Sequence, residues 1–177
     1  MGITSLNRDT RERILNAGLE IVSERGFAGV SMGVLAERSG LSKSGLFAHF
    51  ASKEDLQLQL LQVAEEALRR QVVEPAMKAE AGLPRLQELM RRWLGWAARA
   101  GLPGGCPLYA AAFEFDDQPG AVSEYLVASH RRWTEFLTAV IQDAVDLHQL
   151  RDDTDTAQVA WQLNHLYGSP HRPTAVT

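Results

Sequence analysis

Residues 32–50 read MGVLAERSGLSKSGLFAHF, and this stretch decides the fold of the N-terminal part of the chain. Gly40 divides the stretch into two short segments in which apolar residues recur at helical spacing. A glycine can adopt the positive φ that a tight turn requires. Ala36 is small enough to let a second helix approach the first, and Leu46 can fill the space between them. This spacing predicts a helix-turn-helix, in which two short helices cross at a steep angle.

Serine side chains mark where each of these two helices begins. Ser31 precedes a predicted helix over 32–39, and Ser42 precedes a predicted helix over 43–50; serine is a favoured N-cap. The second helix would present polar side chains on its outer face, where they could reach phosphates and base edges in the major groove of DNA. The stretch therefore points to nucleic-acid recognition.

Helical periodicity extends over nearly all of the remaining chain, and we find no convincing strand pattern. Glycine- and proline-containing breaks at 101–105 and 116–120 divide the C-terminal part. The segment 106–115 is apolar on nearly every face, which predicts a helix buried all round, and the tail 168–177 is predicted to be irregular. The sequence thus predicts an all-α fold of about eight helices. The other predicted helices cover 8–25, 53 to about 75–80 (Pro75 ending or kinking it), 83–99, 122–148 and 156–167.

Composition excludes several classes of protein. The chain has 177 residues, enough for a substantial core, and its single cysteine cannot form an internal disulfide. Neither a signal-type N-terminus nor a stretch of membrane-spanning length is present, so we expect a cytoplasmic protein.

The net charge of −4 at first argues against a nucleic-acid binder. Residues 1–53, however, hold seven Lys and Arg against five Asp and Glu, a net charge of +2 that leaves −6 for the remainder. A net charge of +2 alone is weak evidence, but together with the helix-turn-helix pattern it predicts a DNA-binding domain over 1–53 and an acidic second domain over 54–177.

Residues 10–60, from TRERIL to the segment FASKEDL, resemble the N-terminal domain of the TetR family of bacterial transcriptional regulators. The resemblance is close over about fifty residues, and the PGGC and AAFEFDDQPG segments are similar to one branch of the family's C-terminal domains. It implies an all-α homodimer that binds a palindromic operator, usually as a repressor, and that a small molecule releases. No cofactor is implied.

The resemblance places DNA contacts on residues of the helix-turn-helix and its flanks. Two departures from the family pattern stand out: Phe47 replaces a usual Tyr and loses a hydroxyl, and Gly45 replaces Thr, Ser or Ala. Phe47 has two interpretations, a core aromatic residue or an apolar contact to DNA. The candidate DNA-binding residues are Ser31, Ser42, Lys43, Ser44, Gly45, Phe47, His49 and Lys53.

Aromatic side chains in the C-terminal part could line an apolar effector cavity, although each could also be ordinary core. Glu114, Asp116 and Asp117 could meet a cationic ligand or form a solvated loop, and we favour the loop. Cys106 could sense electrophiles or be a buried structural thiol, and we favour the thiol. The candidate ligand-binding residues are Trp93, Trp96, Tyr109, Phe113 and Trp133.

The resemblance also implies that the helices 122–148 and 156–167 form a dimer bundle. The family's last helix is usually longer than the one that ends here at Tyr167, which would reduce the dimer surface.

Two other classes of protein are alternatives to a DNA-binding regulator. A di-iron enzyme would need Glu-x-x-His pairs, and no histidine of the chain has a glutamate three residues before it. Walker, Gly-x-Ser-x-Gly and Cys-x-x-Cys motifs are also absent, so we expect no catalysis. The remaining alternative is a helical interaction module of the same fold that has lost operator binding.

Overall fold

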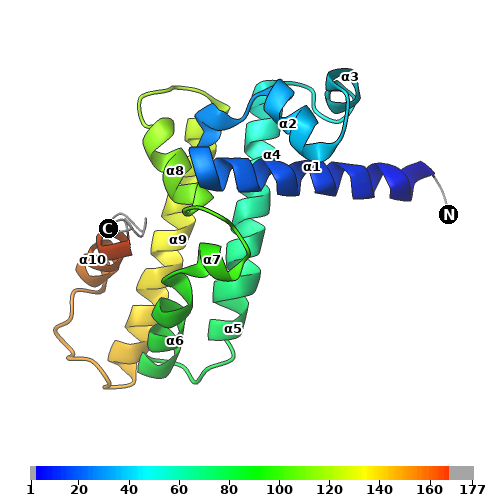
Figure 1. Cartoon of the computed structure of the whole chain (residues 1–177). Helices are drawn as coiled ribbons and strands as arrows, with labels where there is room; N and C mark the ends of the chain where they lie inside the picture. Colours follow the sequence, from blue (N-terminus) through cyan, green and yellow to red (C-terminus); the bar gives the residue numbers. More distant parts are fainter. Residues whose placement is uncertain (1–2, 168–177) are drawn as a thin grey trace, which may run out of the picture. The chain divides into compact units, whose positions relative to one another are not determined.

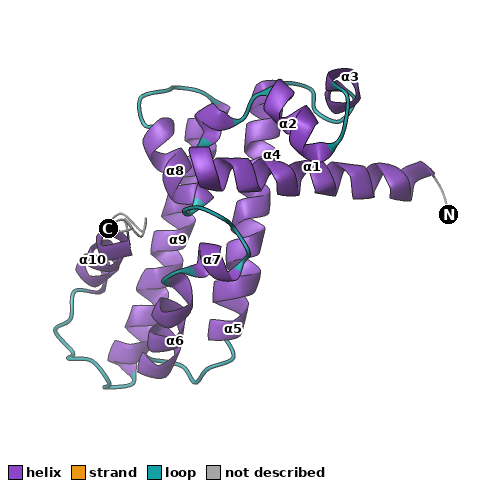
Figure 2. Cartoon of the chain, in the orientation of Figure 1, coloured by secondary structure: helices purple, strands orange, loops and turns teal. Residues whose placement is uncertain are grey.

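The computed structural model describes residues 3–167, and every element within that range is helical (Figures 1 and 2). The predicted all-α fold is therefore confirmed for this part of the chain, whereas the tail 168–177 lies outside the described residues. In chain order the elements are α1 (Ile3–Arg25), the short η1 (Phe27–Gly29), α2 (Met32–Ser39), α3 (Lys43–Phe47), α4 (Lys53–Leu68), the π-helical η2 (Arg69–Val73), α5 (Glu74–Ala76), α6 (Leu83–Trp93), α7 (Trp96–Arg99), α8 (Pro107–Glu114), α9 (Ala121–Asp146) and α10 (Thr156–Tyr167).

Two compact units make up the chain. The first joins the N-terminal segment up to Glu66 with Gly101–Tyr125, and the second joins Ala67–Ala100 with the segment from Leu126 onward. The chain passes between the units three times. Helix α9 begins in the first unit and continues in the second.

The core of the first unit forms where α1 approaches α4. Gly18 makes this approach close, because a Cβ built there would lie 2.7 Å from Leu60 Cδ2. Ile14 and Val22 on the predicted face of α1 are fully buried, as are Leu56 and Leu60 on α4. The apolar stripes read from the sequence therefore face the core.

The helix predicted from Lys53 changes its winding before Pro75. Residues Arg69–Val73 form a π-helical segment and α5 ends at Ala76. Proline has no N–H to donate, and its ring crowds the carbonyl four residues earlier, so a regular helix cannot run through it. The predicted effect of Pro75 is confirmed.

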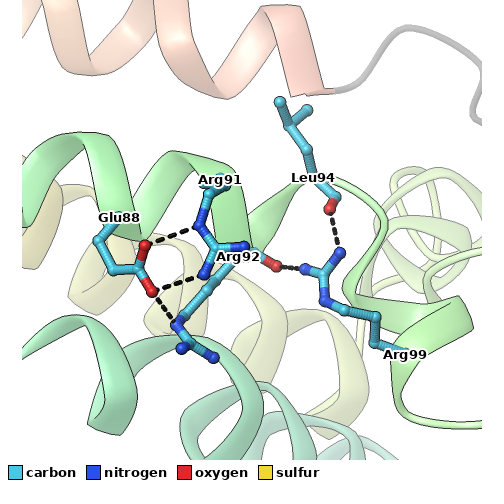
Figure 3. Close-up of polar contacts among 5 residues, drawn as sticks. All are labelled: Glu88, Arg91, Arg92, Leu94 and Arg99. Carbon is cyan, nitrogen blue, oxygen red and sulfur yellow. Dashed lines mark hydrogen bonds and ion pairs between the residues drawn. The ribbon is translucent and has the colours of Figure 1, made fainter.

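The helix predicted over 83–99 is interrupted at Leu94–Gly95, and this part of the prediction was wrong. Gly95 has φ 70°, a left-handed conformation that ends α6. Arg99 holds the break, since its Nη1 donates to the Leu94 carbonyl at 2.8 Å and its Nη2 to the Arg92 carbonyl (Figure 3).

A carboxylate balances the arginines beside this break. The two Glu88 oxygens accept from Arg91 at 2.7 Å and 2.7 Å, and one of them also accepts from Arg92 at 2.5 Å (Figure 3). Arg91, followed by Arg92, lowers the pKa of Glu88 to about 2. Glu88 therefore stays ionised throughout the physiological pH range.

Helix α8 is not buried all round, contrary to the prediction from its apolar composition. Ala111 is buried, but Ala112 is exposed and Phe113 has 72% of its surface exposed within the single chain. One face of α8 packs on α1 and η1 in the first unit, and the face that carries Phe113 does not. None of the described helices combines the length and apolar character needed to cross a lipid bilayer.

Helix α9 ends two residues earlier than predicted, in a turn at His148. This residue adopts φ 54°, and Gln149 N donates to the Ala144 carbonyl at 2.9 Å. The Gln149 side chain then caps α6 by accepting from Leu83 N at 2.5 Å. Gly82 leaves room for this cap, because a Cβ there would lie 2.1 Å from Gln149 Oε1.

Candidate nucleic-acid interface

The two predicted serine caps are present. Ser31 Oγ accepts from Val34 N at 3.2 Å at the start of α2, and Ser42 Oγ accepts from Gly45 N at 3.1 Å at the start of α3. Both serines have extended backbones, as N-cap residues do. The predicted N-caps Ser31 and Ser42 of these two helices are therefore confirmed.

The turn between α2 and α3 depends on the backbone of Gly40. Gly40 adopts φ 68° and ψ 30°, and the next amide, Leu41 N, donates to the Ala36 carbonyl at 3.0 Å. A Cβ at Gly40 would meet nothing within 4 Å, so the requirement for glycine is conformational and not steric.

Apolar residues fill the space between the two helices. Leu35 and Leu46 are fully buried, and Phe50 and Ala36 are nearly so. The positions of Ala36 and Leu46 were predicted from the sequence. Burying the four side chains fixes the outer face of α3 relative to α2. The helix-turn-helix is thus a packed unit and not two independent helices.

The outer face of α3 carries exposed polar side chains. Ser42, Lys43 and Ser44 are all exposed, and the Ser42 and Ser44 hydroxyl oxygens lie 3.1 Å apart. A Cβ at Gly33 of α2 would lie 3.5 Å from Lys43 Cε, which places the aliphatic part of Lys43 over α2. Hydroxyl and ammonium donors of this kind are groups that contact DNA phosphates and base edges.

Helix α3 is shorter than predicted, since it ends at Phe47 and not at Phe50. His49 N donates to the Leu46 carbonyl at 2.9 Å, a tighter turn than an α-helix makes. His49 therefore lies after the helix and is half-buried, with its ring 6.4 Å from that of Phe50. The two interpretations of the Phe47 side chain both fall outside the described part of the structure.

Lys53 is exposed at the first residue of α4, and the turn that leads to it is fixed by a reciprocal cap. Ser52 Oγ accepts from Asp55 N at 3.0 Å, while Asp55 Oδ2 accepts from Ala51 N at 2.9 Å. The Ala51 amide, followed by the Gln59 side chain, holds the pKa of Asp55 below its usual range. These bonds fix the start of α4, where Lys53 lies.

The candidate ligand-binding residues fall in two groups, one in each unit. In the second unit Trp93 packs edge-on against Trp133, with ring centroids 4.7 Å apart. Trp93 also stacks on Tyr167, with ring centroids 4.2 Å apart and an angle of 10° between the ring planes. Trp133 Nε1 donates to Asn164 Oδ1 at 3.0 Å. Tyr167 and Asn164 were missed from the sequence because they lie at the end of the last predicted helix, far along the chain from Trp93.

Trp96 is fully buried in the second unit, and among the described residues its indole Nε1 has no hydrogen-bond partner. In the first unit, Tyr109 and Phe113 lie on one face of α8 with ring centroids 5.3 Å apart. Burial, followed by the nearby Cys106, raises the pKa of Tyr109. The prediction that these residues bind a ligand stays a prediction.

Two of the three acidic residues near the second break are exposed, as expected for a solvated loop. Asp116 and Asp117 face solvent. Glu114 does not belong with them, because its carboxylate accepts from the backbone N–H groups of Phe27 and Ala28. Cys106 is half-buried at the N-cap of α8, less enclosed than a core thiol. Within the described residues, no three His, Cys, Asp or Glu side chains are grouped to hold a metal ion.

Two family models match the chain. Residues 14–60 match the model of bacterial regulatory proteins of the tetR family, and residues 82–171 match that of the tetracyclin repressor-like C-terminal domain. The HTH-type transcriptional regulator UidR of Escherichia coli strain K12 is 31% identical over 163 residues, which cover 90% of this chain and 79% of UidR. The HTH-type transcriptional activator FasR of Mycolicibacterium smegmatis is 41% identical over 58 residues, 32% of this chain and 26% of FasR.

Solved structures share the fold. A TetR transcriptional regulator from Chloroflexus aurantiacus superimposes with a TM-score of 0.82 at 24% identity, over 92% of this chain and 82% of that one. AibR, in complex with isovaleryl coenzyme A and operator DNA, superimposes with a TM-score of 0.75 at 19% identity, over 90% of this chain and 84% of AibR.

Proposed function

The chain belongs to the TetR family of bacterial regulatory proteins, and on that premise we propose that it binds operator DNA as a homodimer under the control of a small ligand. The observation that carries the proposal is the outer face of α3. Ser42, Lys43 and Ser44 are exposed there above a buried apolar layer, on a helix whose start is fixed by a serine cap. Side chains so placed are free to enter a major groove without any unfolding.

We assign DNA contact to two classes of residue in this arrangement. Lys53 and the Ser31 hydroxyl would contact phosphates, which position the protein, and Lys43 with Ser42 and Ser44 would reach base edges, which give sequence preference. Gly45, Phe47 and His49 complete the surface proposed for contact. Bound as a dimer, two such helices would lie about one DNA turn apart, near 34–40 Å.

The effector is proposed to be a small apolar or amphipathic molecule bound in the C-terminal part. Support comes from the aromatic group of Trp93, Trp133 and Tyr167 and from the buried, unpartnered indole N–H of Trp96, which could donate to a ligand oxygen. AibR, which shares the fold, was crystallised with isovaleryl coenzyme A. Repression relieved by the ligand is the proposed mode, supported by the tetracyclin repressor-like C-terminal match.

The dimer is proposed to form through α9 and α10. Both helices carry large apolar side chains that a single chain leaves exposed: Val127, Trp161 and Leu166 each have more than half of their surface exposed. Covering such side chains with a second copy would remove them from water. We further propose that the protein works in the cytoplasm, where operator DNA lies, and that it has no catalytic activity of its own.

The proposal is tested by selecting DNA from a random library with the purified protein and measuring the affinity of the selected sequence in a gel-shift titration. We expect a palindromic sequence, a complex of two chains per site and an affinity that falls steeply with salt. The DNA upstream of the protein's own gene is the first natural fragment to test. Recovery of no preferred sequence would contradict the proposal and favour the interaction module that has lost operator binding.

A further inference from the structure

Trp96 is the first residue of the short helix α7, and the break before it determines where its side chain lies. Leu94 and Gly95 separate α6 from α7, and the left-handed backbone of Gly95 turns the chain. Arg99 closes this turn from the other end of α7, because its guanidinium donates to the Leu94 and Arg92 carbonyls (Figure 3). These bonds hold α7 at the end of α6 and so fix the backbone that carries Trp96.

The surroundings of Trp96 are apolar and closed to solvent. Helix α7 packs on the π-helical segment η2, whose Val72 is fully buried. Ala97, the next residue of α7, is also buried, and Trp96 itself has no exposed surface within the single chain. Bulk water therefore does not reach its indole N–H.

This indole N–H has no hydrogen-bond partner among the described residues. Trp133 shows the usual arrangement, since its Nε1 donates to Asn164 Oδ1 at 3.0 Å, and Trp161 is 55% exposed, so that water can accept from it. A buried donor that stays unpaired costs free energy, and folded proteins pair the large majority of such groups. An indole N–H is a donor only, so the group that Trp96 lacks is an acceptor atom.

The acceptor that fits this place is uncharged. A carboxylate buried beside Trp96 would need a cation, because burying an unpaired charge costs far more than burying a neutral polar group. The described arginines of α6, η2 and α7 do not offer one, since each faces solvent, is bonded to a carboxylate or lies near the far end of α6. The exposed ones are Arg69, Arg70, Arg91 and Arg99, while Arg92 is bonded to Glu88 and the distant Arg85 pairs with Asp143. The carbonyl oxygen of a ketone, ester or lactone needs no counter-ion.

We propose that Trp96 recognises the polar atom of the effector, with its Nε1 donating to the neutral carbonyl oxygen of an otherwise apolar ketone, ester or lactone. The inference rests on the proposed function, in which a small molecule binds in the C-terminal part, and it adds the chemical class of that molecule. Arg99 is a positioning residue in this arrangement. It contacts only the backbone before α7, and it acts on the effector through Trp96.

The hydrogen-bond state of Trp96 can be followed by NMR of protein whose indole nitrogens are isotopically labelled. The chain has four tryptophans, and the Trp96 signal is the one that is missing from Trp96→Phe. In the free protein we expect the Trp96 indole proton to resonate upfield of the Trp133 proton, which is hydrogen-bonded. The probes are methyl ketones with linear and cyclic apolar groups, each tested beside the carboxylate and the hydrocarbon of the same skeleton. A ketone that binds should move the Trp96 proton downfield, and the hydrocarbon should not.

The same titrations give the affinities from which the contribution of the indole N–H is calculated. The ratio of ketone affinity to hydrocarbon affinity should fall about tenfold in Trp96→Phe, the effect of losing one buried hydrogen bond. Tyr125→Phe is the matched control, because it removes a donor from a ring in the first unit, where the Tyr125 hydroxyl donates to Glu65 at 2.6 Å. This control should keep the wild-type ratio.

Arg99→Gln provides a second variant if Trp96→Phe does not fold, since Arg99 is exposed and its replacement removes no buried side chain. We expect it to shift the Trp96 proton in the free protein and to lower the affinity ratio by about threefold. Arg99→Lys, which keeps a donor, should restore part of both. Arg91→Gln makes the same change at an exposed arginine whose partner is Glu88, and it should leave both unchanged.

Three results would overturn the inference and leave the proposed function standing. They are a Trp96 proton that is already downfield in the free protein, ketones that fail to move it, and a Trp96→Phe variant that keeps the wild-type affinity ratio. A downfield shift caused by the carboxylates and not by the ketones would overturn the choice of a neutral acceptor. Failure to select any DNA would instead overturn the proposed function, and the NMR titrations, which contain no DNA, would then still show whether Trp96 binds a carbonyl compound.

Discussion

Gly104 lies where α1 meets the loop before α8, and it has no room for a side chain. A Cβ there would lie 2.0 Å from the Ser23 carbonyl oxygen and 2.5 Å from its carbon. These are backbone atoms, and the oxygen also accepts from Gly105 N, so they cannot rotate away. We expect Gly104→Ala to lower the free energy of unfolding by about 1–3 kcal/mol, the usual cost of overpacking, as measured by denaturation followed by circular dichroism.

The adjacent glycine provides the control for this substitution. A Cβ at Gly105 would meet nothing within 4 Å, and its φ lies outside the left-handed region. Gly105→Ala should therefore leave the free energy of unfolding unchanged or raise it by up to about 1 kcal/mol, because alanine restricts the unfolded chain. Equal losses in the two variants would show that the loop tolerates no side chain for reasons other than contact with Ser23.

The start of α4 depends on the ionised form of Asp55. Its folded-state pKa lies below the usual range because the Ala51 amide and the Gln59 side chain donate to the carboxylate. The resulting stabilisation is complete above the ordinary carboxyl pKa, near pH 4, and is lost as the pH falls through the lowered pKa. Asp55→Asn should reduce the free energy of unfolding by about 0.5–1 kcal/mol at pH 7, and this difference should vanish towards pH 2.

Glu54→Gln is the comparison for that pH dependence. Glu54 is exposed in the same first turn of α4, so the substitution removes one negative charge from the same helix end. We expect a smaller loss of stability than for Asp55→Asn at pH 7. Denaturant titrations of the wild type and the two variants between pH 2 and pH 7 measure the effect. If Glu54→Gln loses as much free energy of unfolding as Asp55→Asn, Asp55 acts through its charge alone and not through its hydrogen bonds.

Elements with local signals were predicted well. The serine caps and Gly40 fixed α2 and the start of α3, because a cap and a left-handed turn each involve residues at most a few positions apart. The break at Gly95 was missed although a glycine marks it. A lone glycine within a helical pattern costs only about 1 kcal/mol, so Gly95 alone does not predict a break, and nothing in the sequence pattern shows that Arg99 will donate to the Leu94 carbonyl.

The candidate ligand-binding residues show which contacts cannot be predicted from sequence patterns. Tyr109 and Phe113 were grouped with the tryptophans because all are aromatic residues of the C-terminal part, yet α8 packs on α1 in the first unit. The hydrogen bond from Phe27 to Glu114 joins residues 87 positions apart. Neither periodicity nor composition specifies which distant segment a given side chain will meet, so the sequence predicts a solvated loop at Glu114 and not the contact with Phe27 and Ala28.

At the scale of the whole molecule, charge is distributed in alternating blocks. Residues 67–100 hold seven Lys and Arg against three Asp and Glu, whereas 54–66 and 101–125 each hold four acidic residues and no Lys or Arg. The unit that contains the helix-turn-helix includes both acidic segments, so its net charge is negative despite the +2 of residues 1–53. Attraction to DNA must therefore come from a few exposed Lys and Arg side chains within residues 1–53, and not from a positive potential over the whole unit.

Lys53 is one of these cations, and its contribution can be read from the salt dependence of operator binding. Each phosphate contact contributes about 0.9 to the slope of log affinity against log salt concentration, so Lys53→Gln should reduce the slope of a homodimer by about 1.8. Because a phosphate contact carries no sequence information, the selected operator and random DNA should weaken by a similar factor. Lys78→Gln, which removes an exposed lysine outside the helix-turn-helix, should leave the slope unchanged. Gel-shift titrations at four salt concentrations measure both variants; if Lys78→Gln lowers the slope as much as Lys53→Gln does, DNA binding depends on the basic block 67–100, and the start of α4 is not the phosphate contact.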